Sequence, residues 1–125
     1  MNIASMKRLA EVHPDLQRVI SRAEELITED GFGFVVTEGV RTNERQKELV
    51  AKGASQTMKS RHLTGHAVDL AVTVDGEVTW NWPVYAKLAK IVKEAAQIEG
   101  VPITWGGDWK MRDGPHFELT WKSYP

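Results

Sequence analysis

One segment of the chain, residues 60–69 (SRHLTGHAVD), combines histidine and carboxylate side chains. His62 lies where neither helical nor strand periodicity is visible, whereas Asp69 lies inside the apolar run 67–72, which is typical of a strand. A carboxylate inside an apolar strand is costly unless a cation compensates its charge, and a metal ion would do so. Catalytic zinc uses about three protein ligands, usually histidine and carboxylate, and keeps one position open for water. This segment could supply two of those ligands.

A second segment, residues 113–118 (DGPHFE), could complete such a site. Asp113 stands three positions before His116 at a tight turn, so His116 could bind the metal while Asp113 reaches a water that the metal activates. Zinc lowers the pKa of that water to roughly 7, and a nearby carboxylate can then remove its proton and pass it to a leaving amine. The two segments together indicate hydrolytic metal chemistry.

Two other interpretations compete with this one. In the plainer of the two, His62 is an ordinary loop histidine and Asp69 an ordinary strand aspartate in a salt bridge. In the other, His62 and His66 bind zinc from one turn of a helix, as in helical zinc proteases. That arrangement lacks its general base, because Leu63 follows the first histidine where a glutamate is needed, and the next residues, Thr64-Gly65, disfavour a helix. We therefore expect His66 to support the ligands or to face the substrate.

Composition limits the classes of protein to consider. The 125 residues fit one domain, 1–125, and the 16 basic and 17 acidic residues nearly cancel. Without a basic excess, neither nucleic acid nor an anionic membrane surface is indicated as a partner. The chain has no cysteine, which excludes disulfides, thiolate metal ligands and thiol nucleophiles. Any metal must therefore be held by histidine and carboxylate.

The N-terminal residues 1–16 contain no continuous apolar stretch of the kind found in signal peptides, and no apolar run approaches the roughly 20 residues that span a bilayer. We therefore expect a chain that is synthesised in the cytoplasm without membrane insertion and acts as a monomer. A substrate outside the membrane would require other machinery to release the protein to it.

Hydrophobic periodicity predicts the elements that position these residues. Apolar residues recur at three-and-four spacing over about 14–29 and 83–98, which predicts two amphipathic helices. A shorter helix is expected over about 44–51 and a loop over 54–65. Strands are expected at 34–40, 67–72, 77–79, 103–105 and 116–121. This order predicts an α+β fold, in which helices pack on a small, largely antiparallel sheet.

The two segments also resemble the motifs of a known family. The pattern Ser-x-His-x-x-Gly-x-Ala-x-Asp, followed by an acidic residue three before a histidine, is similar to that of the zinc D-alanyl-D-alanine carboxypeptidase and L-alanyl-D-glutamate endopeptidase family. The matching positions are Ser60, His62, Gly65, Ala67 and Asp69 in the first motif, and Asp113 and His116 in the second. The run 105–109 (WGGDW) before DGPHFE most resembles the phage endolysin branch and its prophage-derived relatives in bacterial secretion loci, which cleaves L-Ala–D-Glu bonds.

The resemblance implies a DD-peptidase (hedgehog-like) fold and a Zn²⁺ cofactor, and it assigns roles to residues of this chain. The implied metal ligands are His62, Asp69 and His116. Asp113 would be the catalytic base, and Arg41 would contact the substrate or the developing oxyanion. The residues expected to bind substrate are Arg41, Ser60, His66 and Trp109.

We therefore expect a zinc endopeptidase whose partner is the peptidoglycan stem peptide and which acts on the cell wall in the periplasm. One alternative is a D-Ala–D-Ala carboxypeptidase, whose site must recognise a free terminal carboxylate. The other is a non-catalytic wall-recognition module that keeps the metal but does not turn over substrate. Asp113 argues against this module, because binding alone does not need a base.

Overall fold

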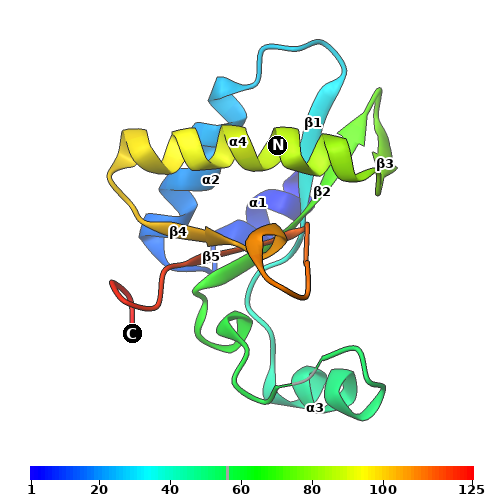
Figure 1. Ribbon diagram of the computed structural model, residues 1–125, viewed down its shortest axis with the longest axis vertical. Coiled ribbons are helices and arrows are strands. Elements are labelled where there is room, and N and C mark those ends of the chain that lie inside the picture. Colours follow the sequence, from blue (N-terminus) through cyan, green and yellow to red (C-terminus); the bar gives the residue numbers. More distant parts are fainter. Residues whose placement is uncertain (56) are drawn as a thin grey trace.

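The structure of the protein is a computed structural model, in which residues 1–55 and 57–125 are described. The chain contains both helices and strands, as expected for an α+β fold (Figure 1). The helices are α1 (Ile3–Leu9), α2 (Pro14–Leu26), α3 (Asn43–Ala51) and α4 (Trp82–Glu99), with short 3-10 helices η1 (Arg61–Thr64) and η2 (Gly106–Asp108). The strands are β1 (Phe32–Glu38), β2 (Ala67–Val74), β3 (Glu77–Thr79), β4 (Ile103–Trp105) and β5 (His116–Leu119).

The described strands form one sheet in the order β1-β2-β5-β4, with β3 paired to β2. Every pairing in it is antiparallel, which confirms the predicted fold class. The central strand is β2, and most of its side chains are buried because both of its faces are covered. Its register with β5 places Asp69 directly opposite His116. Two residues that lie 47 positions apart in the sequence thus become cross-strand neighbours.

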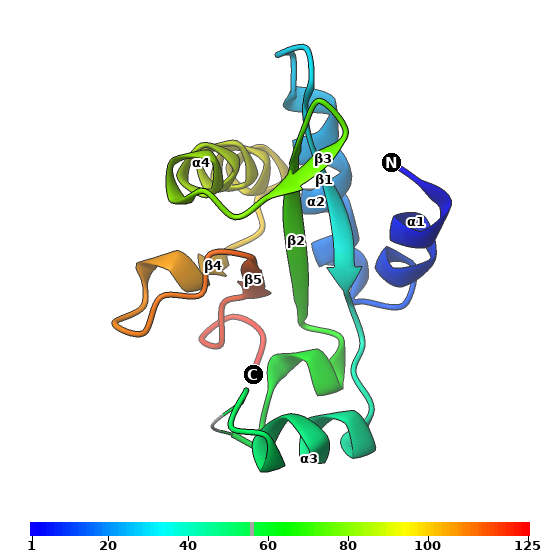
Figure 2. The ribbon, with the colours of Figure 1, turned by 90° about the vertical axis from the view of Figure 1, so that its right-hand side faces the viewer.

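The hydrophobic core lies between the sheet and the two long helices. Helix α2 packs against α4, as the two predicted amphipathic stripes require, and α1 packs against β1 (Figure 2). The buried apolar residues of α2 are Leu16, Val19, Ile20 and Ala23, and those of α4 include Leu88, Ala89, Val92, Ala95 and Ala96. None of the helices in the described part of the chain is both long and apolar enough to cross a membrane.

Several element boundaries differ from the predicted ones. Helix α1 was not predicted, because its short segment has no clear apolar stripe and its buried polar residue is Ser5, whose hydroxyl accepts a hydrogen bond from the amide of Val36. Strand β5 ends at Leu119 and not at residue 121. Helix α2 ends at Leu26, because Ile27 already has an extended backbone.

Helix α3 stands apart from the layered core and lies below the sheet in Figure 1. It begins after Thr42, whose hydroxyl accepts a hydrogen bond from the amide of Arg45, and it covers almost the predicted range. Its one buried side chain is Gln46, which donates hydrogen bonds to the hydroxyl of Ser55 and to the carbonyl of Thr57. Helix α3 and the following loop are thereby held together as one wall of a cleft.

Candidate metal centre

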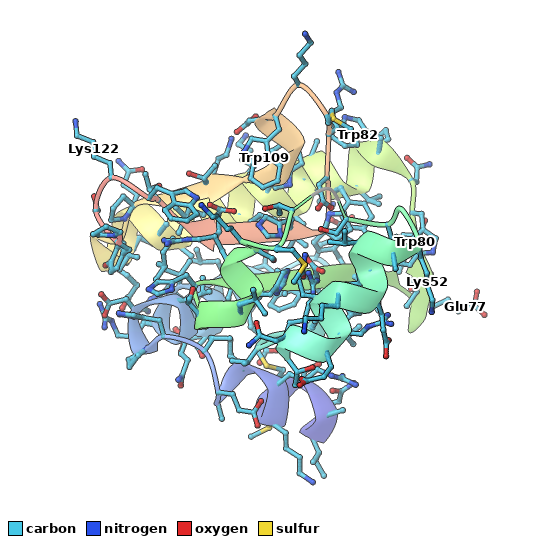
Figure 3. All side chains as sticks on the ribbon, turned by 90° about the horizontal axis from the view of Figure 1, so that it is seen from below. Lys52, Glu77, Trp80, Trp82, Trp109 and Lys122 are labelled. Carbon is cyan, nitrogen blue, oxygen red and sulfur yellow. The ribbon has the colours of Figure 1, made fainter. Side chains whose placement is uncertain are left out.

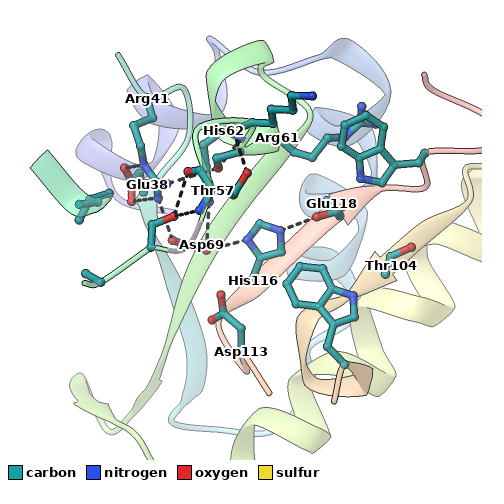
Figure 4. Close-up of a pocket in the computed structure, with 17 residues that line it drawn as sticks. Glu38, Arg41, Thr57, Arg61, His62, Asp69, Thr104, Asp113, His116 and Glu118 are labelled. Atoms are coloured by element: carbon teal, nitrogen blue, oxygen red, sulfur yellow. Dashed lines mark hydrogen bonds and ion pairs between the residues drawn. The ribbon is translucent and has the colours of Figure 1, made fainter. Parts of the chain in front are cut away.

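The side chains of His62, Asp69 and His116 meet at the floor of this cleft (Figure 4). Nε2 of His62 and Nδ1 of His116 each lie 3.3 Å from the same oxygen, Oδ1 of Asp69. One ligand atom from each residue lies within 4.8 Å of the others, which is a spacing that a single metal ion can bridge. The structure therefore brings together the three residues that the sequence motifs selected.

The second nitrogen of each imidazole ring is fixed by a hydrogen bond. Nδ1 of His62 lies 2.8 Å from the carbonyl oxygen of Gly39, and Nε2 of His116 lies 2.7 Å from Oε1 of Glu118. A carbonyl and a carboxylate can only accept, so these nitrogens donate and the opposite nitrogens carry free lone pairs. Both lone pairs face Asp69. This is the arrangement in which metal-binding histidines are held by their outer partners.

The hydrogen bonding of these groups also fits a metal ion. Among the described residues, Nε2 of His62 and Oδ1 of Asp69 are buried without any hydrogen-bond partner. Buried polar atoms rarely lack a hydrogen-bond partner, because such an atom gives up its hydrogen bonds to water and gains none in return. A cation bound between them would accept both lone pairs, and the donor set of two imidazoles and one carboxylate is one that zinc favours.

The electrostatics of the cleft floor favour a positive charge at the same point. Burial alone would raise the pKa of Asp69, but the adjacent His116 and His62 outweigh it and hold the pKa well below its usual range. Burial alone would lower the pKa of His116, but Asp69 and Glu118 outweigh it and raise the pKa to about 9. The carboxylates that attract a proton to this ring would attract a metal cation in the same way.

Asp113 lies at the cleft beside these ligands, in the turn that leads into β5 (Figure 4). Its amide donates a hydrogen bond to the carbonyl of Gly106, and its carbonyl accepts one from the amide of His116. Partial desolvation by the cleft walls raises the pKa of its carboxyl, and the charge of Asp69 raises it further. Both effects bring the pKa of the carboxyl closer to neutral pH, where a general base works best.

Arg41, which follows β1, also reaches the cleft. Its guanidinium donates two hydrogen bonds to Glu38, of 2.6 and 2.8 Å, and a third of 2.7 Å to the side-chain oxygen of Gln46. A fourth, longer bond of 3.3 Å goes to the hydroxyl of Ser60, and Nη2 lies 3.9 Å from Oδ2 of Asp69. Hydrogen bonding to Glu38 raises the pKa of Arg41. The group is thus held rigidly beside Asp69 and remains charged.

Ser60 and Gly65 bracket η1 and explain why the first motif needs these two residue types. The hydroxyl of Ser60 accepts a hydrogen bond from the amide of His62 and so caps the start of η1. Gly65 ends η1 with a left-handed backbone, at φ +73°, which glycine adopts without strain. This turn holds His62 on the cleft floor directly before β2 begins.

Trp109 lines the cleft, whereas His66 does not. The ring of Trp109 lies 5.0 Å from that of His116, measured between ring centroids. The imidazole of His66 instead lies 5.6 Å from that of His13, and its Nδ1 makes a hydrogen bond with the hydroxyl of Thr64. The expectation that His66 faces the substrate is therefore not supported by its position. His13 caps the start of helix α2, where its Nδ1 accepts a hydrogen bond from the amide of Asp15.

The cleft has a volume of about 800 Å³ and includes residues that sequence reasoning did not select. These are chiefly Glu38, Lys59, Arg61, Thr104, Glu118 and Trp121. Strand periodicity carried a signal for one of them: Glu118 stands two positions after His116 along β5, so the two side chains share a face. The others come from element ends, the short strand β4, η1 and loops, where the sequence shows no period long enough to assign a face.

Comparisons with known proteins show which family the chain resembles. The family model described as phage L-alanyl-D-glutamate peptidase matches residues 1–123. The L-alanyl-D-glutamate peptidase of Escherichia phage T5 is 33% identical over 96% of this chain and 88% of its own length. The peptidoglycan L-alanyl-D-glutamate endopeptidase CwlK of Bacillus subtilis is 26% identical over 88% of this chain and 74% of its own length.

A solved structure extends the likeness to three dimensions. The crystal structure of the Serratia marcescens L-Ala D-Glu endopeptidase ChiX has a TM-score of 0.92 to this structure at 47% sequence identity. The match covers 100% of this chain and 92% of the other. Together with the family-model match over almost every residue, it identifies the chain as a member of the phage L-alanyl-D-glutamate peptidase family.

Proposed function

We propose that this chain is a zinc-dependent endopeptidase that hydrolyses the L-Ala–D-Glu bond of peptidoglycan stem peptides. The observation that carries the proposal is the convergence of His62, Asp69 and His116 beside Asp113 in an open cleft, in a chain of this family. Proteins named for that activity match it in sequence and in structure. Because stem peptides belong to the wall, the cell wall would be its place of action.

His62, Asp69 and His116 would hold the zinc ion through Nε2, a carboxylate oxygen and Nδ1, respectively. Bound zinc supplies Lewis acidity, which lowers the pKa of a water to roughly 7 and polarises the scissile carbonyl. Gly39 and Glu118 keep the two imidazoles in the required tautomers, because each accepts a hydrogen bond from the nitrogen that faces away from Asp69.

The carboxylate of Asp113 would act as the general base and then as the general acid. It takes a proton from the attacking water and delivers it to the leaving amine of D-Glu, so that the same side chain serves both halves of the reaction. The raised direction of its pKa supports this role, because a carboxyl with an ordinary pKa is a weaker base. A wall-recognition module without turnover would have no use for this group.

Arg41 would stabilise the negative charge that develops on the carbonyl oxygen of the scissile bond. Its guanidinium is held by Glu38, Gln46 and Ser60 and needs no rearrangement during the reaction. The same pairing bears on the carboxypeptidase alternative. A carboxypeptidase needs a cation for the terminal carboxylate, but two of the hydrogen bonds of Arg41 are already made to a carboxylate, that of Glu38. This observation favours the endopeptidase.

We infer that one copy of the chain is sufficient, because the metal ligands, the base and Arg41 all come from the same chain. The proposed activity is tested by digesting purified muropeptides that end in D-Ala–D-Ala with the zinc-loaded protein. Mass spectrometry should find products with a new amino terminus at D-Glu. Release of free D-Ala with the L-Ala–D-Glu bond intact would show a carboxypeptidase, and no cleavage by zinc-loaded protein would leave only a binding module.

A further inference from the structure

The cleft has two different walls, one on each side of the metal ligands. Figure 4 shows Glu38, Arg41 and Thr57 on one side of Asp69, and Thr104 and Glu118 on the other side of His116. The first wall comes from the end of β1, the segment that leads into α3, α3 itself and the loop after it, and this loop also contributes Lys59 to the lining. The second wall comes from the β4–β5 end of the sheet. A substrate that crosses the cleft therefore meets different chemistry before and after the scissile bond.

The second wall is aromatic. Trp109, with 39% of its surface exposed, follows η2, and Trp121, with 54% exposed, follows β5. Both are lining residues of the cleft. Flat, exposed indole faces at a binding cleft are suited to the apolar faces of sugar rings, because an indole combines a large apolar surface with a polar edge.

The exposed indole of Trp121 stacks on a buried cation, which restricts its motion. The guanidinium of Arg61 lies 3.9 Å from the ring centroid of Trp121, and only 5% of Arg61 is exposed. Arg61 donates hydrogen bonds to the carbonyls of Leu119 and Tyr124, which join the C-terminal residues to η1. An aromatic side chain supported in this way loses little freedom when a ligand stacks on it.

The first wall offers an accessible cation. Lys59 is exposed, and among the described residues it forms no ion pair. Arg41 on the same wall is instead engaged by Glu38. On the aromatic wall the cation, Arg61, is buried and hydrogen-bonded to two carbonyls, and Glu118 is buried as well. Among the described lining residues, a negative charge on a substrate therefore meets an accessible and unpaired cation on the side of Lys59 and not on the side of the tryptophans.

The substrate has the matching asymmetry. In a stem peptide, L-Ala is joined through an uncharged lactyl group to the muramyl sugar, whereas D-Glu is linked onward through its side chain and keeps a free α-carboxylate. Only one residue separates the scissile bond from the lactyl group, so the sugar lies within roughly 7 Å of extended chain from that bond. A sugar at that distance must lie at the edge of the cleft.

We propose that Trp109 and Trp121 form a subsite for the muramyl sugar and that Lys59, across the cleft, pairs with the α-carboxylate of D-Glu. This inference rests on the proposed function and adds to it the direction in which the substrate lies. The stem peptide runs from the aromatic wall, across the ligands, to the wall built by α3. Both chemical neighbours of the L-Ala–D-Glu bond are then recognised, which separates it from other amide bonds of the wall.

The sugar half of the proposal is tested with two substrates that share one peptide. One is the disaccharide muropeptide, and the other is the same peptide with an N-acetyl group in place of the sugar. The ratio of their kcat/KM values should fall roughly three- to tenfold in Trp109→Ala and in Trp121→Ala, and should be retained in the matching Phe variants. Trp80→Ala is the matched control, because Trp80 is 68% exposed but lies outside the cleft lining (Figure 3).

The charge half uses a second substrate pair, in which D-Glu is compared with D-isoglutamine, whose α-carboxylate is an amide. Lys59→Met should reduce the preference for the carboxylate roughly two- to fivefold, as expected for an exposed ion pair. Lys52→Met is the control, because Lys52 is an exposed lysine outside the cleft. Unchanged ratios in the cleft variants would overturn the inference. If Lys59→Met changed the sugar ratio and the tryptophan variants changed the carboxylate ratio, the substrate would lie in the opposite direction, and the inference would be overturned.

A binding measurement distinguishes failure of this inference from failure of the proposed function. N-acetylmuramyl-L-alanine is added to the zinc-loaded protein, and the indole N–H signals of the tryptophans are followed by NMR, with N-acetyl-L-alanine as the matched ligand. N-acetylmuramyl-L-alanine should shift the signals of Trp109 and Trp121 and leave that of Trp80 unchanged, whereas N-acetyl-L-alanine should shift none of them. If the L-Ala–D-Glu bond is not cut, the proposed function fails, whereas cutting without selective shifts or changed ratios overturns only the subsites.

Discussion

Glu118 accepts a hydrogen bond of 2.7 Å from Nε2 of His116, and this bond points the other ring nitrogen of His116 toward Asp69. Both residues lie on β5 and both are buried. A carboxylate in this position fixes the tautomer of the ring and makes Nδ1 a stronger donor to a metal ion. The function of the cleft thus depends on a residue that would not touch the metal.

Replacing Glu118 with Gln should therefore weaken zinc binding without abolishing the fold, because the amide keeps the shape and one acceptor but loses the charge. We expect a loss of roughly 10–100-fold in zinc affinity, the usual effect of removing such an outer partner. Competition with a zinc chelator measures it, and Glu94→Gln, at an exposed position of α4, is the control. Equal affinity in Glu118→Gln and wild type would show that this bond does not support the ligand.

Asp113→Ala should retain zinc, because the base is distinct from the three ligands, while kcat falls by roughly 10²–10⁴-fold. His116→Ala should lose zinc and activity together. Metal content per chain and turnover are measured on the same preparations. Equal loss of metal in the two variants would make Asp113 a ligand and would remove it from the role of base.

Arg41→Met should reduce kcat/KM by roughly 10²–10³-fold, the usual cost of removing one oxyanion donor, with zinc content unchanged. Arg41→Lys tests the geometry, because a single ammonium group cannot reproduce the paired bonds to Glu38 together with the bond to Gln46. Its activity should stay well below that of wild type. Full activity in Arg41→Lys would mean that only the charge matters, and full activity in Arg41→Met would remove Arg41 from catalysis.

Gly106 packs closely against the turn that carries Asp113 and His116, and its carbonyl accepts a hydrogen bond from the amide of Asp113. A Cβ added at Gly106 would lie 2.4 Å from the carbonyl oxygen of Asp113 and 3.0 Å from Cβ of His116. Because the backbone must shift to relieve these contacts, Gly106→Ala should cost about 1–3 kcal/mol of stability and reduce kcat. Gly114→Ala, in the same turn, is the matched control.

At Gly114 an added Cβ would approach no atom closer than 3.4 Å, the distance to the ring of Trp82, which is ordinary contact. Thermal unfolding and turnover of the two alanine variants should therefore differ clearly. If Gly106→Ala and Gly114→Ala had the same melting temperature and the same kcat, the position of Asp113 would not depend on close packing against Gly106.

The sequence motifs selected the side chains at the cleft floor because a charged Asp69 in an apolar run is unusual and because Asp113 and His116 stand close together. The motifs could not show that Asp69 and His116 are cross-strand partners, since strand register is decided by packing across the sheet. Gly39, which orients His62, was also beyond sequence reasoning, because its contribution is a backbone carbonyl.

The predicted helices agree best with the structure where the apolar period is long, as in α2 and α4. Short α1 was missed, because it packs on β1 partly through Ser5, a polar residue. The role expected for His66 stays a prediction that its position does not support. Its place beside His62 in the sequence suggested a role in the cleft, but the left-handed turn at Gly65 and the start of β2 direct it toward His13.

The central claim is that His62, Asp69 and His116 form the zinc site, and anomalous diffraction at the zinc absorption edge from crystals of the zinc-loaded protein tests it most directly. We expect one strong peak per chain, bonded to Nε2 of His62, a carboxylate oxygen of Asp69 and Nδ1 of His116, at about 2.0–2.2 Å from each. A peak elsewhere, for example between His13 and His66, or no peak at the cleft floor in fully active protein, would contradict the claim.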